Sequence, residues 1–255
     1  ARHLLGLEHR RRIIGAPSRV RLRAAKQARG AGKTRRLSGC PPGKHYLELF
    51  GGIGGFTAAA AELHLRIITP FELENGSHFD LCRPAVEKEI GGWIKSGKVW
   101  AVSFGTPCGR WSQANTTGAA GSQHDLAGMQ CALFTVRILR ICRKFGVLVV
   151  VENPRSSQLW DWPPLREELD RHGIVRVDFN MCAYDAAWFK PTRLEGNLPG
   201  LCSLGLTCPG HDKHVVLQGT VGIPGQAQRW RTSFAAAYPP RLCRSFGRLL
   251  SDAAP

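Results

Sequence analysis

The fold of this chain is decided by the stretch Tyr46-Leu47-Glu48-Leu49-Phe50-Gly51-Gly52-Ile53-Gly54-Gly55-Phe56. Its first half is apolar nearly throughout, which predicts a strand covered on both faces at the centre of a parallel sheet. Its second half predicts a tight turn that opens a helix, and the glycines allow a ligand to approach the backbone closely. Open parallel sheets bind ligands at the carboxyl ends of their strands, so this turn is a candidate binding loop.

Short apolar runs alternate with helical stretches from His45 onward, an order that predicts a sheet with helices on its faces. The expected strands are residues 45–50, 65–72, 99–104, 147–152 and 174–180, with one more near 192–194. The expected helices are residues 56–63, 84–95, 126–144, 164–171 and 240–250. The predicted fold class is therefore α/β, Rossmann-like, with a mostly parallel sheet.

The composition predicts a soluble globular protein, because 43 % of the 255 residues are hydrophobic and 21 % are charged. No stretch approaches the roughly 18 apolar residues of a membrane span, and we see no secretory signal. The nine cysteines are scattered, which favours reduced thiols over a disulfide framework. We expect an intracellular protein without a membrane partner, and the sequence leaves its oligomeric state undetermined.

A basic arm, residues 1–44, holds ten Arg and three Lys against Glu8 and so carries +12 of the net charge of +16. Such a charge run favours contact with nucleic acid, because each neutralised phosphate releases counterions. An organelle transit peptide and a disordered tail are the alternatives. We expect this arm to be followed by a folded domain at 45–255, and we favour the nucleus, or an organelle if the arm is a transit segment.

A carboxylate, Glu72, ends the second expected strand 21 residues after Gly51. At this place in nucleotide-binding βαβ units, an acidic residue accepts the hydroxyls of a ribose. Together with the glycine loop, it predicts a cofactor that contains adenosine. Asp80 could accept from the adenine amino group, although Asp also begins helices and a helix is expected soon after it.

A thiol and a second carboxylate follow two further strands. The thiol of Cys108 ends the run Phe104-Gly105-Thr106-Pro107-Cys108, where it is placed to attack a ligand, although most cysteines are small buried residues. Glu152 follows five apolar residues, and burial there would raise its pKa and make it a proton donor. The neighbouring Arg110 is expected to lower the pKa of the thiol.

Taken together, these segments resemble the cytosine carbon-5 DNA methyltransferase family, in a divergent branch such as those carried by mobile elements. Residues 49–56 are similar to its motif I, Thr106-Pro107-Cys108 to its Pro-Cys motif IV, Glu152-Asn153 to its Glu-Asn motif VI, and residues 238–247 to the tail of motif X. The four occur in family order. The resemblance implies a Rossmann-like S-adenosylmethionine-dependent methyltransferase fold with a reduced target-recognition region.

The resemblance also implies a chemistry, in which Cys108 adds to carbon 6 of cytosine while Glu152 donates to ring N3. Carbon 5 then takes a methyl group from S-adenosylmethionine. The implied cofactor contacts are Phe50, Gly51, Gly52, Ile53, Gly54, Glu72, Asp80 and Pro107. The implied substrate contacts are Asn153, Lys190 and Arg193, since the target base must be flipped out of a duplex or already unpaired.

The chain departs from the family pattern at several places. Gly109 replaces the usual Gln after the catalytic Cys, Pro154 replaces a Val, and motif VIII is absent. Only about 40 residues lie between Arg193 and Ala235, too few for a large target-recognition domain. We favour DNA over RNA as the substrate. An RNA cytosine-5 methyltransferase and a nucleic-acid-binding protein without catalysis are the alternatives.

A small insert at 198–220 contains the array Cys202, Cys208, His211 and His214. Two thiols and two imidazoles in a loop rich in Gly and Pro could converge tetrahedrally on zinc. The spacing differs from the common zinc-finger patterns, and unrelated cysteines with surface histidines are the alternative. The sequence therefore predicts a structural zinc ion in addition to S-adenosylmethionine.

Overall fold

The computed structural model describes residues 43–112, 123–221 and 229–255, all within one compact unit, Gly39–Pro255. The basic arm expected at 1–44 thus lies almost entirely outside the described residues. None of the helices in the described part of the chain is long and apolar enough to cross a membrane.

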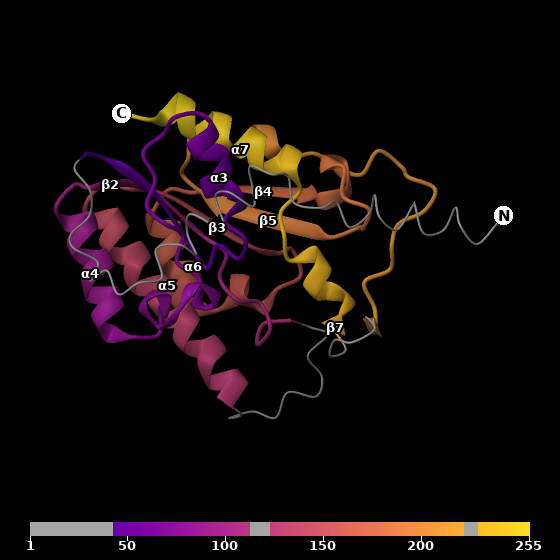
Figure 1. Cartoon of the computed structure of the whole chain (residues 1–255), viewed down its shortest axis with the longest axis horizontal. Helices are drawn as coiled ribbons and strands as arrows, with labels where there is room; N and C mark the ends of the chain where they lie inside the picture. The colour runs from indigo at the N-terminus through magenta and orange to yellow at the C-terminus, as the bar shows by residue number, and fades with distance from the viewer. Residues whose placement is uncertain (1–42, 113–122, 222–228) are drawn as a thin grey trace. The chain divides into compact units, whose positions relative to one another are not determined.

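A five-stranded sheet with the order β1-β2-β3-β5-β4 forms the middle layer (Figure 1). Its strands are β1 His45–Leu49, β2 Val99–Phe104, β3 Leu148–Pro154, β4 Val175–Asn180 and β5 Pro191–Gly196. The first three strands pair in parallel, whereas β5 is antiparallel to both of its neighbours, β3 and β4. The predicted Rossmann-like α/β fold with a mostly parallel sheet is confirmed.

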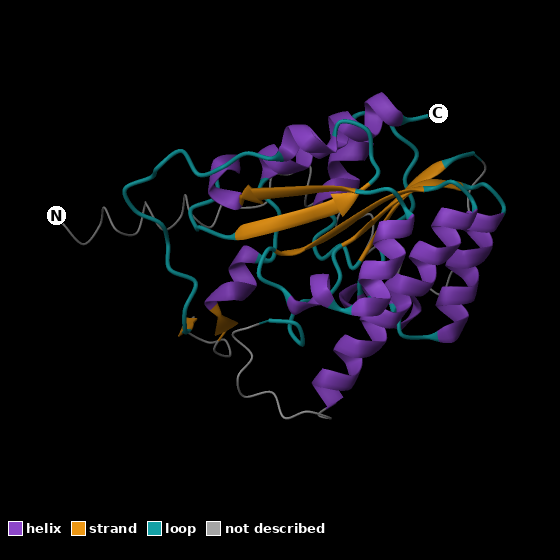
Figure 2. Cartoon of the chain, turned by 180° about the vertical axis from the view of Figure 1, so that it is seen from behind, coloured by secondary structure: helices purple, strands orange, loops and turns teal. Residues whose placement is uncertain are grey.

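Helices cover both faces of this sheet (Figures 1 and 2). One face carries α4 Pro84–Lys95, α5 Gln123–Lys144 and α6 Pro163–Arg171, and the other carries α3 Gly55–Glu62 and α7 Pro240–Ala253. All five expected helices are present. The shorter elements are η1 Leu73–Asn75, η2 Ser77–Phe79, η3 Gln158–Asp161, η4 Met181–Tyr184, η5 Leu201–Leu204, η6 Arg231–Ala235 and the strand pair β6 Thr220–Val221 and β7 Arg229–Trp230.

Two apolar clusters, one on each face, hold these layers together. Alternate residues of β1 belong to different clusters, because side chains of a strand point to opposite faces. Leu47 and Leu49 pack with α4 and α5, whereas Tyr46 packs with Phe56 and Phe246 from α3 and α7. All residues of β1 are therefore buried, as its apolar sequence predicts.

The segment expected as a strand at 65–72 forms only two isolated parallel bridges to β1, Tyr46 with Ile67 and Leu49 with Phe71. Pro70 has no N–H to donate, so a continuous ladder is interrupted there. The segment still lies on one side of β1 while β2 lies on the other. The connection from this segment to β2 therefore crosses from one side of β1 to the other. The carboxyl end of β1 is thus a topological switch point, which is where open α/β sheets bind ligands.

Candidate active site

Three loops meet at the carboxyl ends of β1, β2 and β3. The N–H of Gly105, after β2, donates to the carbonyl oxygen of Leu49 in β1 (3.0 Å). A Cβ atom at Gly105 would lie 2.7 Å from the Phe50 carbonyl oxygen and 3.1 Å from the Tyr238 hydroxyl oxygen. Only glycine therefore permits this close approach of the first two loops and Tyr238.

The glycine loop after β1 has an unusual backbone. Phe50, Gly52 and Gly54 have φ angles of 56°, 53° and 70°, so the chain enters the left-handed region three times before α3. The N–H of Gly52 donates to Glu72 Oε2 (2.9 Å), and the N–H of Leu73 donates to Glu72 Oε1 (3.0 Å). The structure thus places the Glu72 carboxylate against the loop, and each oxygen keeps a second acceptor position.

Asp80 and Pro107 lie in the other segments predicted to contact the cofactor. Asp80 is half-buried, and its Oδ1 accepts from the N–H of Cys82 (2.9 Å) in the turn before α4. Pro107 and Ile53 are both exposed. No observation on the described residues tests a cofactor contact at these three positions, which remain predictions.

Glu48, inside β1, was not singled out by the sequence analysis. Its Oε2 accepts from the backbone N–H of Thr57 (2.7 Å) and from the Thr57 hydroxyl (2.6 Å), which ties the strand to the first turn of α3. Burial raises the pKa of Glu48 to about 7. Its position inside an apolar run was the available signal, and it is the same signal that identified Glu152.

Cys108 is half-buried at the end of the β2 loop. Burial raises the pKa of its thiol, Lys190 lowers this pKa, and Glu152 raises it again. The structure therefore brings Cys108, Glu152 and Lys190 within electrostatic reach of one another, although 82 positions separate the cysteine from the lysine.

Glu152 is buried with only 8 % of its surface exposed. The Tyr238 hydroxyl donates to its Oε2 (3.0 Å), whereas Oε1 has no hydrogen-bond partner among the described residues. Burial raises the pKa of Glu152, and Lys190 and the Tyr238 hydrogen bond lower it. A buried carboxyl group with one free oxygen beside a half-buried thiol can hold or release a proton to a bound ligand.

Asn153 is fully buried and joins the two loops. Its Nδ2 donates to the carbonyl oxygen of Thr106 (2.6 Å), two residues before Cys108, and to that of Glu152 (3.1 Å). The Thr106 hydroxyl is in turn bonded to that of Thr135 in α5 (2.9 Å). The structure thus shows Asn153 positioning the cysteine loop, while its predicted substrate contact is untested.

Two cations were expected near the site, and the structure places them differently. Lys190 is half-buried, and its Nζ donates to the carbonyl oxygen of Ala235 (3.1 Å). Arg110 forms an ion pair with Asp125 in α5, and its guanidinium carbon lies 5.4 Å from the centre of the Trp111 ring. Lys190, rather than Arg110, is the cation whose charge lowers the pKa of Cys108.

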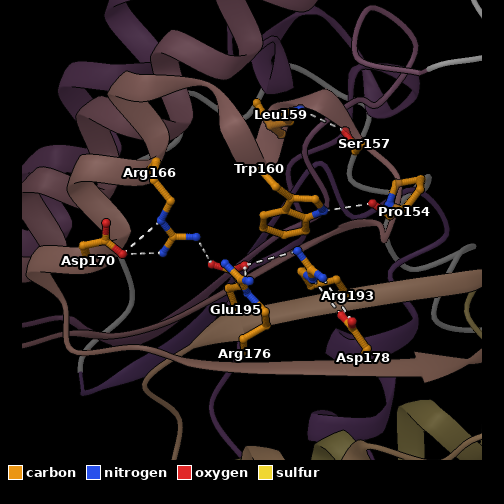
Figure 3. Close-up of polar contacts among 10 residues, drawn as sticks. All are labelled: Pro154, Ser157, Leu159, Trp160, Arg166, Asp170, Arg176, Asp178, Arg193 and Glu195. Carbon is orange, nitrogen blue, oxygen red and sulfur yellow. Dashed lines mark hydrogen bonds and ion pairs between the residues drawn. The ribbon is translucent and has the colours of Figure 1, made fainter.

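Arg193, the other cation predicted to contact the substrate, belongs to a network across the sheet face (Figure 3). It donates to both carboxylate oxygens of Asp178 (2.7 and 3.0 Å) and lies over the ring of Trp160, 5.8 Å from its centre. The Trp160 Nε1 donates to the Pro154 carbonyl oxygen (2.8 Å), so the network also fixes the end of β3.

The same network is centred on Glu195 of β5, whose side chain is fully buried (Figure 3). Arg166 from α6 donates to it at 2.6 Å, and Arg176 from β4 donates at 2.8 Å. Arg193 lies 3.9 Å from the same carboxylate. These contacts attach α6 to the antiparallel edge of the sheet and give Arg193 a structural role.

A separate group of possible metal ligands lies after β4. The predicted residues Cys208, His211 and His214 do come together, but the fourth member is Cys182 rather than Cys202. Cys202 is exposed in η5 and does not belong to this group. The predicted ligand set is thus corrected at one position, because the end of β4 supplies a thiol that is distant in sequence.

The chain has matches among solved structures but none among family models or curated proteins. Among solved structures, the chain is similar to the crystal structure of the S. pombe Dnmt2 methyltransferase, with 12 % identity and a TM-score of 0.41. The match covers 60 % of this chain and 50 % of that one. A likeness this distant does not indicate a function. The function is therefore inferred from the geometry of the site.

Proposed function

We propose that the chain is an S-adenosylmethionine-dependent cytosine carbon-5 methyltransferase that acts on DNA. The observation that carries the proposal is that the hydrogen bonds of Asn153 and Tyr238 hold the Cys108 loop and Glu152 together at the switch point of the sheet, with Lys190 close enough for its charge to act on both. This chemistry uses a nucleophile and a proton donor, and a nearby cation stabilises negative charge on either of them.

The residues present fit the proposed cofactor. Gly52 lies in the left-handed region and has nothing within 4 Å of the place of a Cβ atom, so its backbone is open next to the switch point, where an adenosine-containing ligand binds in such sheets. Glu72 stands against this loop and keeps acceptor positions for ribose hydroxyls. When bound, S-adenosylmethionine supplies an electrophilic methyl group on its sulfonium.

The proposed reaction begins at Cys108. Its thiolate forms a bond to carbon 6 of cytosine, while protonated Glu152 gives its proton to ring N3, and carbon 5 thereby becomes nucleophilic. The free Oε1 of Glu152 is available for that contact. After methyl transfer, a base takes the proton on carbon 5, the bond to carbon 6 breaks as ring N3 returns its proton to Glu152, and Cys108 leaves as thiolate.

The surrounding residues hold this pair in place. Asn153 fixes the backbone before Cys108, and Tyr238 orients Glu152 through its hydroxyl. The positive charge of Lys190 stabilises negative charge on either member of the pair. The buried setting strengthens these interactions relative to water.

The mechanism is tested by covalent trapping with a substrate that contains 5-fluorocytosine. Fluorine on carbon 5 cannot leave as a cation, so the adduct with Cys108 stalls after methyl transfer. We expect a denaturation-resistant complex with the wild-type chain and none with Cys108→Ala, which should still bind S-adenosylmethionine in calorimetry. An enzyme that methylates cytosine fully but gives no trapped complex would overturn the carbon-5 mechanism.

The substrate class is tested by methyl transfer from radiolabelled cofactor to duplex DNA, single-stranded DNA and transfer RNA. We expect transfer to DNA, at a site where the base is flipped out or unpaired. Transfer to RNA alone would identify the RNA cytosine-5 alternative. Binding of all three nucleic acids without cofactor binding would identify a non-catalytic binding protein.

A further inference from the structure

We propose that Cys182, Cys208, His211 and His214 bind one structural zinc ion, which fixes the loop after η5 to the segment that carries Lys190. The four ligand atoms all lie within 4.8 Å of one another. They come from two parts of the chain, η4 directly after β4 and the loop 208–214. The metal site itself is independent of the proposed function, and only its effect on Lys190 depends on it.

The distances fit a tetrahedral metal. With Zn–S of about 2.3 Å and Zn–N of about 2.05 Å, tetrahedral angles place a sulfur and a nitrogen ligand about 3.6 Å apart. The Cys208 sulfur lies 3.5 Å from His211 Nδ1 and 3.6 Å from His214 Nε2. The two imidazole rings stand at 89° to each other. His211 presents Nδ1 and His214 presents Nε2 to the Cys208 sulfur, so both nitrogens lie on the side where the ion would be bound.

The donor set indicates zinc and a structural role. Two thiolates and two neutral imidazoles form an S₂N₂ set, which selects zinc in tetrahedral geometry, and the two negative charges balance the ion. Four protein ligands leave no open position for a substrate or water, unlike a catalytic zinc site. Exposure falls from His211, which is exposed, to Cys182, which is buried, so an ion would enter from the solvent side.

Hydrogen bonds around the ligands hold the loop in register. The N–H of Cys208 donates to Asn180 Oδ1 (2.9 Å), and the N–H of Val215 donates to the Ala187 carbonyl oxygen (2.8 Å). His214 also packs edge-on against the ring of Phe189, with the ring centres 5.5 Å apart. These contacts hold the loop against the end of β4 and the segment that follows it. The four ligands are therefore already close together without a metal ion.

The same segment connects the metal site to the candidate active site. Cys182 follows Met181, whose N–H donates to the carbonyl oxygen of Lys190 (3.2 Å). Lys190 in turn is the cation beside Cys108 and Glu152. An ion at Cys182 would therefore limit the motion of the backbone that carries this cation.

The site is tested on the full chain, produced with zinc in the medium and without chelators. We expect about one zinc per chain by mass spectrometry, retained in Cys202→Ser and lost in Cys182→Ser. The Cys202 variant is the matched control, because the sequence pattern alone assigns Cys202 as the ligand. Zinc lost from Cys202→Ser and kept in Cys182→Ser would overturn the assignment, as would the absence of metal from the wild-type chain.

Two further measurements distinguish loss of the metal from loss of the fold: the spectrum of bound cobalt, and a variant of an exposed ligand that the fold does not need. We expect cobalt to give the visible bands of a tetrahedral site and a thiolate charge-transfer band in the wild-type chain and in Cys202→Ser, and neither in Cys182→Ser. His211 is exposed, so His211→Ala should retain the wild-type circular dichroism and lose the metal. A folded His211→Ala chain with full zinc content would refute the site. A chain that binds zinc but methylates nothing would refute the proposed function and leave the metal site intact.

Discussion

Replacing Tyr238 by Phe removes one hydroxyl group from the candidate active site and leaves the aromatic ring. The ring stacks on Phe56 with the ring centres 4.3 Å apart, and this packing is retained in the variant. The lost hydroxyl is the donor to Glu152 Oε2 (3.0 Å). In the variant, Oε2 of Glu152 loses its tyrosine donor, and Oε1 already has no hydrogen-bond partner among the described residues.

The cost depends on the charge of Glu152. A hydrogen bond between neutral groups contributes about 0.5–1.5 kcal/mol, and one to a charged group contributes about 1.5–3 kcal/mol. Burial raises the pKa of Glu152 above its unfolded value, so folding stability falls as the pH rises from the unfolded pKa through the folded one. The Tyr238 hydrogen bond lowers this pKa, so in Tyr238→Phe the fall extends to higher pH.

We therefore expect Tyr238→Phe to lose about 1 kcal/mol of unfolding free energy where Glu152 is protonated and about 2 kcal/mol where it is ionised in the wild type. Urea unfolding over a pH series measures both values. Tyr184→Phe is the matched control, because the Tyr184 hydroxyl is also buried but donates to the neutral carbonyl oxygen of Leu204 (2.7 Å). Its loss should be about 1 kcal/mol at every pH.

The same loss in both variants over the whole pH series would show that the Tyr238 hydroxyl does not stabilise the charge of Glu152. A loss in Tyr238→Phe that shrinks as the pH rises would also contradict that stabilisation. Kinetics give a second readout, because a higher pKa for the proton donor should move the alkaline limb of kcat/KM to higher pH.

Three further changes test other parts of the molecule. The pKa of Glu48 is about 7 in the folded chain against an ordinary 4.5, so wild-type stability should fall by about 3 kcal/mol between these pH values, and Glu48→Gln should remove that fall in urea unfolding. Glu195→Gln should cost about 2–3 kcal/mol of unfolding free energy, whereas Asp170→Asn, which weakens a pair with an exposed carboxylate in the same network, should cost less than about 0.5 kcal/mol. Deleting residues 1–44 removes +12 of the net charge and should flatten the salt dependence of nucleic-acid binding, while an unchanged slope would favour the targeting alternative.

Most of the fold was predictable because burial on both faces leaves a clear pattern. The central strands are short apolar runs, and each of the expected helices is present to within three residues at either end. The exception is the segment 65–72, where the apolar pattern indicates burial but Pro70 cannot donate to a ladder. Periodicity reports which face of a segment is buried and does not report whether its hydrogen bonds are continuous.

The candidate site was predictable only as far as it depends on strand ends. Cys108 lies in the loop that follows β2, and Glu152 lies near the end of the neighbouring strand β3, so their proximity follows from sheet topology. Tyr238 reaches Glu152 across 86 positions, and no local pattern marks that contact. Arg110 was chosen as the cation from sequence adjacency alone, whereas the ion pair with Asp125 turns it toward α5.

The metal ligands show the same limitation. Cys202 is close in sequence to the other three ligands and was chosen for that reason, whereas Cys182 reaches them through tertiary structure. The N–H of Cys208 bonds to the side chain of Asn180, two residues before Cys182, and so brings the loop back to the end of β4. A contact of this kind depends on how two loops pack together, which spacing along the chain does not specify.

The proposed chemistry requires one negative charge on Cys108 and one proton on Glu152, the reverse of their ordinary order of acidity, with a pKa of about 8.5 for Cys and about 4.3 for Glu. Lys190 lowers the pKa of both groups, so it stabilises one negative charge at the site without selecting which residue carries it. Burial raises the pKa of both groups and favours the required selection, because it disfavours charge more on Glu152, which is almost fully buried, than on Cys108, which is half-buried. The Tyr238 hydrogen bond opposes this selection by stabilising the ionised Glu152, so the residue that orients the proton donor also limits how readily it holds the proton.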